Sequence, residues 1–277
     1  MKLNSNFKKS LLLKSFVMLA IILPQFFCPQ AILCESPKED KRPWAQIVVN
    51  SNDPKALKVL FVGHSKFYIN NMPSMFAAMI KIQNPDMPLK VGSVFGSSYS
   101  LQEHWTNKLA GIFIKEKGPW DYVVFIARSG NPVTKPKEVE IYLNLFKQEM
   151  KVGKMVLTEN FSFRKEEYTK IHSATNKLAG KLKCEILPVG TAWNLVQSSN
   201  PKIGLFAPDN HHPNIKGTYL MASVCYSFFL NKKSNLKPDA LGFKIPGKTG
   251  TFNFSKSDVE TFHKAAWQAV SSKKENQ

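Results

Sequence analysis

Short apolar runs alternate with amphipathic stretches along most of this chain. The apolar runs are mostly rich in Val and Ile and are bounded by Gly, Pro, Asn or charged residues, as buried β-strands are. This pattern predicts five strands, at residues 58–62, 89–94, 122–126, 155–158 and 185–189.

The stretches between these runs repeat their apolar residues with the period of a helix. We expect helices at residues 72–82, 101–115, 136–150, 166–182, 215–230 and 258–271, the last opened by a capping box from Ser257 to Glu260. Alternating strands and helices indicate an α/β protein with three α/β/α layers and about five parallel strands. A ligand site is then expected beyond the carboxyl ends of the strands.

The length and composition point to one globular domain preceded by an export signal. The chain has 277 residues and 43% apolar residues, enough for a single core. Lysines, then an apolar stretch, then small or neutral residues follow one another near the amino terminus, in the order of a secretory signal peptide. We expect a signal peptide at residues 1–34, a polar linker at 35–56 and the folded domain at 57–277.

The signal predicts an exported protein, periplasmic or extracellular. The apolar core, residues 16–23, is shorter than the roughly 20 residues that a membrane-spanning helix needs, which favours cleavage over anchoring. A retained signal anchor stays open because neither side of Cys34 offers a clean cleavage site. A lipoprotein is less favoured, since Leu33 stands where a small residue should precede the cysteine.

The positive charge predicts attraction to polyanions. The formal net charge is +18, and removing the four lysines of residues 1–34 leaves 18 − 4 = +14. Arginine occurs only at positions 42, 128 and 164, and no basic cluster is interleaved with aromatics, so nucleic-acid binding is disfavoured. We expect a solvated lysine surface that could attract anionic envelope polymers. The oligomeric state cannot be inferred from the sequence.

Two cysteines remain in the mature chain, Cys184 and Cys225. They could pair in an oxidising compartment, but each lies in an apolar pattern where free cysteine packs as a small hydrophobic residue. Burial is slightly favoured over pairing.

Two short motifs supply the chemistry of an activated serine. Gly63-His64-Ser65 closes the first apolar run, and Asp209-Asn210-His211-His212-Pro213 precedes a helical pattern. A serine, a carboxylate and an imidazole together can make a hydroxyl nucleophilic. Alternatives remain at this stage: Asp209 could be a turn former, and His211 could be the base instead of His212.

The motifs resemble those of SGNH or GDSL-type serine hydrolases, and especially a branch of secreted bacterial members. The resemblance covers about residues 57–230 and includes six landmarks in order. These are Val59-Leu60-Phe61-Val62-Gly63-His64-Ser65, Asn70-Asn71-Met72-Pro73, Ser100-Leu101-Gln102-Glu103-His104-Trp105, Trp120-Asp121-Tyr122-Val123-Val124, Pro188-Val189-Gly190-Thr191-Ala192-Trp193, and Asp209-Asn210-His211-His212-Pro213 followed by Gly217-Thr218-Tyr219-Leu220-Met221-Ala222.

The resemblance implies a flavodoxin-like fold and hydrolysis of a carboxylic ester, often an acyl group on a carbohydrate, without metal or cofactor. Ser65 would be the nucleophile, His212 the base that precedes proline, and Asp209 the carboxylate that orients it. The oxyanion would be bound by the N–H of Ser65, a backbone N–H near Gly96 and a side-chain amide, for which Asn131 is the candidate.

This chain departs from the branch at the segments that bind the oxyanion. The usual glycine pair is replaced by Gly96 followed by two serines, and two expected glutamines are missing between Phe125 and Ser129. Asn131 or Arg128 could substitute. Besides an active esterase, the alternatives are a catalytically impaired relative that binds a glycan or envelope polymer, and a basic scaffold with an incidental triad. His64, also atypical, is expected to be buried and hydrogen-bonded rather than catalytic.

Two further patterns are set aside. Residues 242–249 fit the expression of a phosphate-binding loop, but no buried strand precedes them and no helix start follows. The six histidines show no metal-ligand spacing.

Overall fold

A computed structural model describes residues 42–150, 153–236 and 254–275. These residues all belong to one compact unit. The expected signal peptide, the start of the expected linker and the phosphate-loop-like residues 242–249 lie outside the described part.

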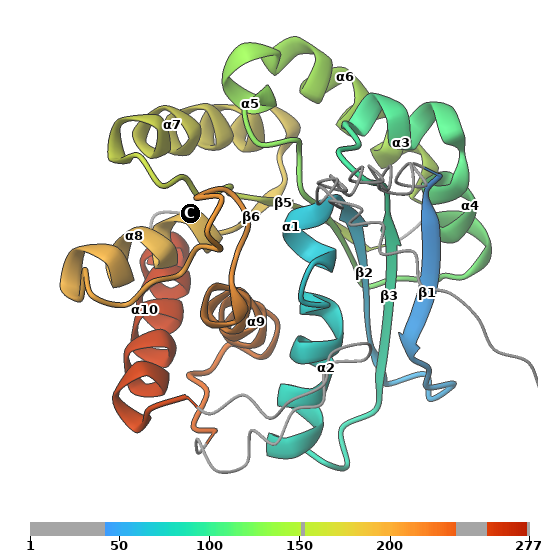
Figure 1. The fold of residues 1–277 in the computed structure, drawn as a ribbon. Helices are drawn as coiled ribbons and strands as arrows, with labels where there is room; N and C mark the ends of the chain where they lie inside the picture. The colour runs from blue at the N-terminus through green and yellow to red at the C-terminus, as the bar shows by residue number, and fades with distance from the viewer. Residues whose placement is uncertain (1–41, 151–152, 237–253, 276–277) are drawn as a thin grey trace, which may run out of the picture. The chain divides into compact units, whose positions relative to one another are not determined.

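The described part is built on one six-stranded sheet with the order β1-β3-β2-β4-β5-β6 (Figure 1). The strands are β1 (Trp44–Val49), β2 (Leu57–Gly63), β3 (Leu89–Phe95), β4 (Tyr122–Phe125), β5 (Lys154–Thr158) and β6 (Glu185–Leu187). β2 to β6 are mutually parallel, and β1 runs antiparallel to β3 at the edge. The prediction of an α/β fold with about five parallel strands is confirmed.

Strand β1 lies inside the segment expected to be a linker. Its residues are only partly buried, and polar residues such as Arg42 and Asn50 flank them. The polar average composition of residues 35–56 therefore does not reveal the six-residue edge strand within this segment. The sheet begins before residue 57.

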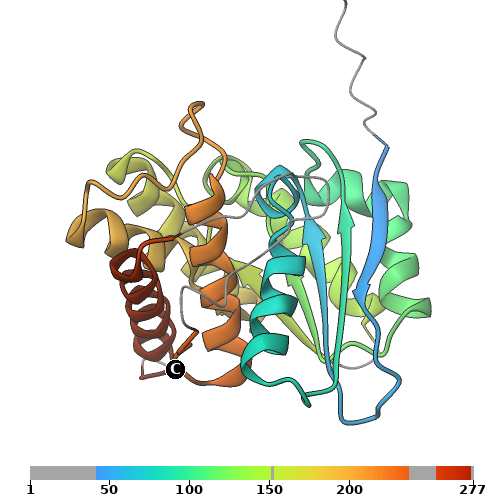
Figure 2. The ribbon, with the colours of Figure 1, turned by 60° about the horizontal axis from the view of Figure 1, so that its bottom comes forward.

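Ten helices are present among the described residues. They are α1 (Ser65–Tyr68), α2 (Met72–Gln83), α3 (Leu101–Asn107), α4 (Leu109–Glu116), α5 (Asn131–Thr134), α6 (Pro136–Glu149), α7 (Lys165–Leu182), α8 (Val189–Ser199), α9 (Ile215–Leu230) and α10 (Lys256–Glu275). α2, α8, α9 and α10 pack into one hydrophobic cluster, and α3, α4, α6 and α7 pack into another (Figure 2). The sheet lies between these two layers.

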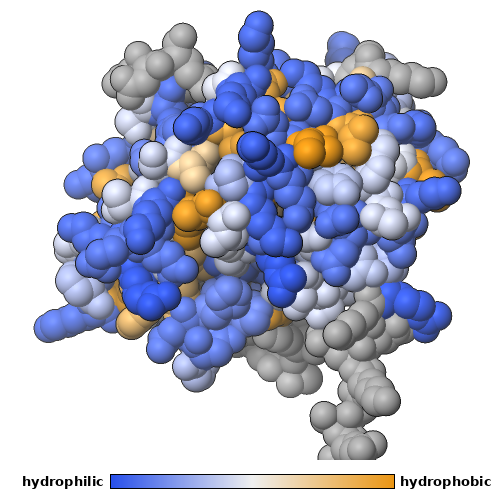
Figure 3. Space-filling view, turned by 90° about the horizontal axis from the view of Figure 1, so that it is seen from above, coloured by the Kyte–Doolittle hydropathy of each residue, from blue (hydrophilic) through white to orange (hydrophobic). Residues whose placement is uncertain are grey.

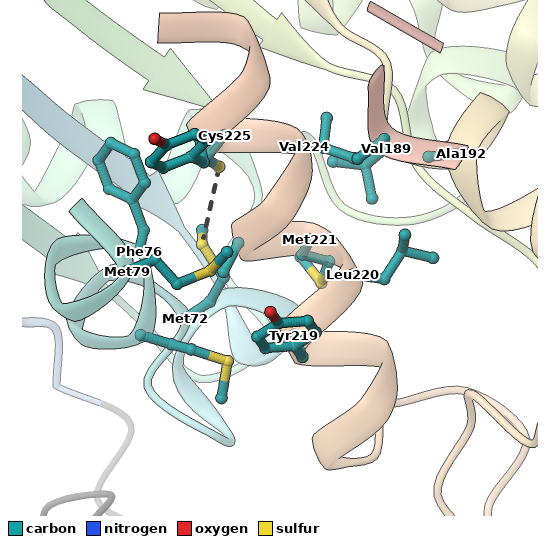
Figure 4. Close-up of a cluster of buried hydrophobic side chains, with 14 of the residues drawn as sticks. Met72, Phe76, Met79, Val189, Ala192, Tyr219, Leu220, Met221, Val224 and Cys225 are labelled. Atoms are coloured by element: carbon teal, nitrogen blue, oxygen red, sulfur yellow. Dashed lines mark hydrogen bonds between the residues drawn. The ribbon is translucent and has the colours of Figure 1, made fainter. Parts of the chain in front are cut away.

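Strand β2 runs through the centre of the core. Val59, Leu60, Phe61 and Val62 of β2 are all fully buried. Figure 4 shows α9 packed against α2, with Cys225 Sγ 3.8 Å from Met72 Sδ. Both cysteines are free: Cys225 is buried and Cys184 is half-buried, as the packing interpretation expected.

Three local expectations need correction. Lys108 adopts a left-handed conformation (φ 67°) and divides the expected helix 101–115 into α3 and α4. The expected strand 185–189 ends at Leu187, and Val189 begins the unpredicted α8. At the start of α10, Ser255 Oγ accepts the Asp258 N–H, so the cap lies two residues before the expected Ser257. None of the described helices is both long and apolar enough to cross a membrane.

Candidate active site

Ser65 stands at the carboxyl end of β2, where the chain turns into α1 (Figure 1). The turn requires glycine before it: a Cβ on Gly63 would lie 2.2 Å from Ile126 Cγ2. Ser65 is half-buried, and its own N–H has no partner among the described residues. The hydroxyl and the N–H therefore both lie at the carboxyl ends of the parallel strands, where ligand sites form in such folds.

The loop between α8 and α9 brings Asp209 and His212 to this serine. His212 Nε2 lies 2.9 Å from Ser65 Oγ, and His212 Nδ1 lies 2.5 Å from Asp209 Oδ2. Asp209 Oδ1 also accepts the N–H groups of His211 and His212, at 3.0 Å each. All three predicted residues thus form one continuous hydrogen-bonded chain.

The carboxylate is held in its ionised form. The hydrogen bond from the His212 side chain, helped by the two backbone N–H groups, lowers the pKa of Asp209 well below its ordinary range. An ionised Asp209 keeps the proton on Nδ1, which leaves Nε2 free to accept the serine proton. His211, the alternative base, packs edge-on against the His212 ring at 4.8 Å and makes no hydrogen bond to Ser65.

The loop between α8 and α9, called the histidine loop below, is fixed to the turn between α1 and α2. Asn70 Nδ2 donates to Pro213 O and Thr218 Oγ1, at 2.9 Å each. Asn214 caps α9 by accepting the Gly217 N–H at 3.0 Å. These buried and half-buried contacts tie both halves of the site together across more than 140 residues of sequence.

The carbonyl of Gly63 is held by two donors. His104 Nε2 lies 2.8 Å from this oxygen, and the Gly96 N–H donates to it at 3.1 Å. Burial lowers the pKa of His104 to about 4, so its ring is neutral near pH 7. The sequence motifs imply an oxyanion donor near Gly96, but the N–H of Gly96 itself already has an acceptor. The next two backbone N–H groups, of Ser97 and Ser98, have none within the described residues.

Asn131 begins α5, immediately after the loop that follows β4. Its backbone N–H donates to Arg128 O at 2.8 Å, whereas its side-chain amide makes no hydrogen bond within the described residues. Arg128 is exposed and equally unpaired there. Between them, Ser129 Oγ is buried without a partner. This loop therefore presents several uncommitted polar groups.

His64 is buried, as expected, with 3% of its surface exposed. Its Nε2 lies 3.3 Å from Ala127 O, which also accepts Asn160 Nδ2 at 2.7 Å. Burial lowers the pKa of His64 to about 3. The ring braces the ends of β2, β4 and β5 and carries no charge near pH 7.

Sequence reasoning missed Lys66, which follows the serine directly. Its side chain is 2% exposed, donates to Phe161 O at 3.0 Å, and lies 4.0 Å from the centre of the Phe161 ring. Phe161 in turn stacks on Trp193 with ring centres 3.8 Å apart. Lys66 has no ion-pair partner among the described residues, and burial lowers its pKa to about 7. The only available signal was a lysine inside an apolar stretch, which does not reveal burial.

Figure 3 looks onto the face at which the parallel strands end. Most of this face is hydrophilic, and apolar side chains are visible as separate patches between the hydrophilic ones. No group of three or more His, Cys, Asp or Glu side chains suited to a metal ion occurs in the described part of the chain. The groups present suit nucleophilic chemistry by the serine.

Neither a search of protein-family models nor a search of curated proteins found a match. Solved structures with a similar fold include a DUF4886 family protein from Bacteroides uniformis, with TM-score 0.60 and 15% identity over 78% of this chain and 95% of that chain. A candidate SGNH hydrolase from Slackia heliotrinireducens has TM-score 0.51 and 19% identity, over 62% of this chain and 98% of that one. An acetylxylan esterase from Geobacillus stearothermophilus has TM-score 0.49 and 14% identity, over 61% and 92%. The first two similarities show that this chain shares the fold of those two proteins.

Proposed function

We propose that this protein is an exported serine hydrolase that cleaves a carboxylic ester. The observation that carries the proposal is the hydrogen-bonded chain from Ser65 Oγ through His212 to Asp209, with distances of 2.9 and 2.5 Å. Export is supported by the order of basic, apolar and small residues at the amino terminus. The resemblance of the motifs favours acyl groups on a carbohydrate as the substrate.

In the first half of the reaction, Ser65 Oγ attacks the acyl carbon while its proton passes to His212 Nε2. The carbonyl electrons move onto oxygen, and the Ser65 N–H at the start of α1, which has no other acceptor among the described residues, is the first donor that we assign to it. A backbone N–H of Ser97 or Ser98 and the Asn131 amide are the further donors that we assign. Collapse of the intermediate expels the alcohol, which takes the proton from His212.

In the second half, water replaces the alcohol. His212 takes a proton from the water, the hydroxide formed attacks the acyl-serine, and the carboxylic acid leaves as Ser65 regains its proton. Asp209 remains ionised throughout and stabilises the imidazolium that forms in each half.

Hydrolysis of p-nitrophenyl acetate tests this assignment. Ser65→Ala and His212→Ala should each lower kcat/KM by at least about 10³-fold, because each removes a group that acts only as part of the unit. His211→Ala is the matched control and should lose less than about tenfold. Equal losses in both histidine variants, or full activity in Ser65→Ala, would refute the assignment.

A catalytically impaired glycan-binding protein is the second candidate. One observation favours it: the Gly96 N–H is already bonded to Gly63 O, so a donor on which the chemistry could depend is committed to the fold. The intact protein would then bind acylated oligosaccharides yet release no acid from a panel of them. Measurable turnover that depends on Ser65 excludes this candidate.

A further inference from the structure

A groove of 570 Å³ lies between α7 on one side and α5 and α6 on the other. Its apolar lining comes from Pro132, Val133, Pro136, Ala174 and Leu178. Four lysines also line it, at positions 137, 170, 177 and 181. The groove is separate from the hydrogen-bonded chain at Ser65 and has no part in the mechanism above.

Three of these lysines have no partner of opposite charge. Lys181 pairs with Glu140 at 2.9 Å, and these two charges cancel. Lys137, Lys170 and Lys177 make no ion pair or side-chain hydrogen bond within the described residues. The groove therefore carries a net charge of three positive units, because Glu140 is the only acidic residue that lines it.

The lysines are spaced along the groove rather than gathered at one point. Lys170 and Lys177 are seven residues apart on α7, which separates them by about 10 Å along one helix face. Lys137 stands on the opposite wall, in the first turn of α6. A single small anion could not contact Lys170 and Lys177 with both side chains extended away from each other, whereas an extended polymer could follow the groove past all three lysines.

The groove continues toward the candidate active site. A second hollow of 420 Å³ shares Val133 and Lys170 with it and reaches Gly130, the residue before Asn131. Arg164 and Glu167, which also line this hollow, form an ion pair at 3.6 Å, so Glu166 is its one unpaired acid. The two hollows together form a path from α7 to the loop that follows β4.

We propose that this groove binds an acidic polysaccharide, in an extended conformation along α7. Carboxylates spaced along the polysaccharide complement the three unpaired lysines, and the faces of its sugar rings can pack against the apolar floor of the groove. A nucleic acid fits less well because the lining contains no aromatic side chain on which bases could stack. A membrane surface fits less well because the lysines line a hollow. The inference rests on the proposed function in one respect: the bound polysaccharide would bring an ester that it carries toward Ser65.

Binding can be tested apart from catalysis by using the Ser65→Ala protein, which cannot turn over an ester. The probe is a fluorescently labelled oligogalacturonate at low salt, with neutral dextran as the uncharged counterpart. Replacing Lys137, Lys170 and Lys177 by Gln should weaken oligogalacturonate binding by about tenfold or more, since each lost exposed pair contributes modestly. Replacing Lys55, Lys202 and Lys264 by Gln changes the net charge equally outside the groove and should weaken it less than about threefold.

A second pair of variants tests whether the shape of the groove matters for binding as well as its charge. Ser173→Trp fills the groove without changing charge and should weaken binding about as much as the lysine triple, whereas Ser173→Ala should not. Equal weakening by both lysine triples, or unchanged binding in Ser173→Trp, would overturn the proposal. Tighter binding of a short polyphosphate than of oligogalacturonate would also overturn it. If the protein that retains Ser65 hydrolyses no ester while oligogalacturonate binding is intact, the proposed function is refuted and the groove assignment stands.

Discussion

At the scale of single residues, Lys66 is the least expected feature of the site. A buried ammonium with one hydrogen bond and an aromatic ring, but no carboxylate partner, is costly for the folded protein. The lowered pKa of Lys66 measures that cost. In the folded protein the ammonium loses its proton with a pKa of about 7, whereas in the unfolded chain the pKa has its ordinary, higher value.

Lys66→Met should therefore stabilise the protein. We expect the free energy of unfolding to rise by about 1–4 kcal/mol at pH 6 to 7. Above pH 7 the unfolded wild type binds more protons than the folded form, so wild-type stability gains as pH rises and the advantage of the variant shrinks toward pH 10. Urea unfolding at pH 6, 8 and 10 measures this. A variant less stable than wild type at pH 6 would show that the ammonium is well solvated.

Asn70 positions the loop that carries His212 and takes no direct part in the proposed reaction. It is buried and donates to Pro213 O and Thr218 Oγ1, so Asn70→Ala should leave two acceptors poorly satisfied and cost about 1–3 kcal/mol in unfolding free energy. Displacement of the histidine loop should lower kcat by about 10²-fold with little change in KM. Asn52→Ala, at an exposed position, is the control. A large rise in KM at constant kcat would contradict the positioning role.

At the scale of elements, the site depends on how closely α9 approaches the loop that carries His212. Gly217, in the first turn of α9, is packed against Trp193 of α8 and Leu205. A Cβ there would lie 2.3 Å from Leu205 O and 2.4 Å from a Trp193 ring atom. Neither neighbour is the free end of a flexible chain, so the helix itself would have to move.

Gly217→Ala should destabilise the protein by about 1–3 kcal/mol and reduce the proposed esterase activity, because a displaced α9 would shift the loop that carries His212. Gly180→Ala in α7 is the matched comparison: nothing lies within 4 Å of its Cβ, and a helical glycine replaced by alanine gains about 0.5–1 kcal/mol. Thermal unfolding of the two variants should thus shift in opposite directions. A shift of the same sign and size in both would show that the close approach carries no strain.

At the scale of the whole molecule, three buried histidines link stability to pH. Burial lowers the pKa of His64 to about 3, and that of His104 and His263 to about 4. His263 joins α10 to α9 through Tyr219, whose hydroxyl lies 2.7 Å from its Nε2. All three rings fold in the neutral form and regain an ordinary pKa of about 6.5 on unfolding.

Stability should therefore fall as the solution becomes acidic. Between about pH 6.5 and pH 4 the unfolded chain binds up to three more protons than the folded protein, a slope of about 4 kcal/mol per pH unit. Urea unfolding at intervals from pH 7.5 to 5 should show a steady loss that begins below pH 7. A free energy of unfolding that stays constant from pH 7 to 5 would mean that these rings are solvated in the folded state.

The sequence by itself determined the fold class, because apolar runs and helical periods are local signals. It also identified Ser65, Asp209 and His212 as candidates, because the motifs around them are short and contiguous. Strand β1 escaped detection since an edge strand is only half-buried, and α8 escaped because it begins two residues after β6 ends.

Only the tertiary structure decided which neighbours these residues meet. It placed His212 rather than His211 at the serine, committed the Gly96 N–H to Gly63 O, and buried Lys66 beside Phe161. These contacts join residues that are 33 to 147 positions apart. Burial and hydrogen-bond partners depend on such distant segments, and no local pattern of residue types encodes them.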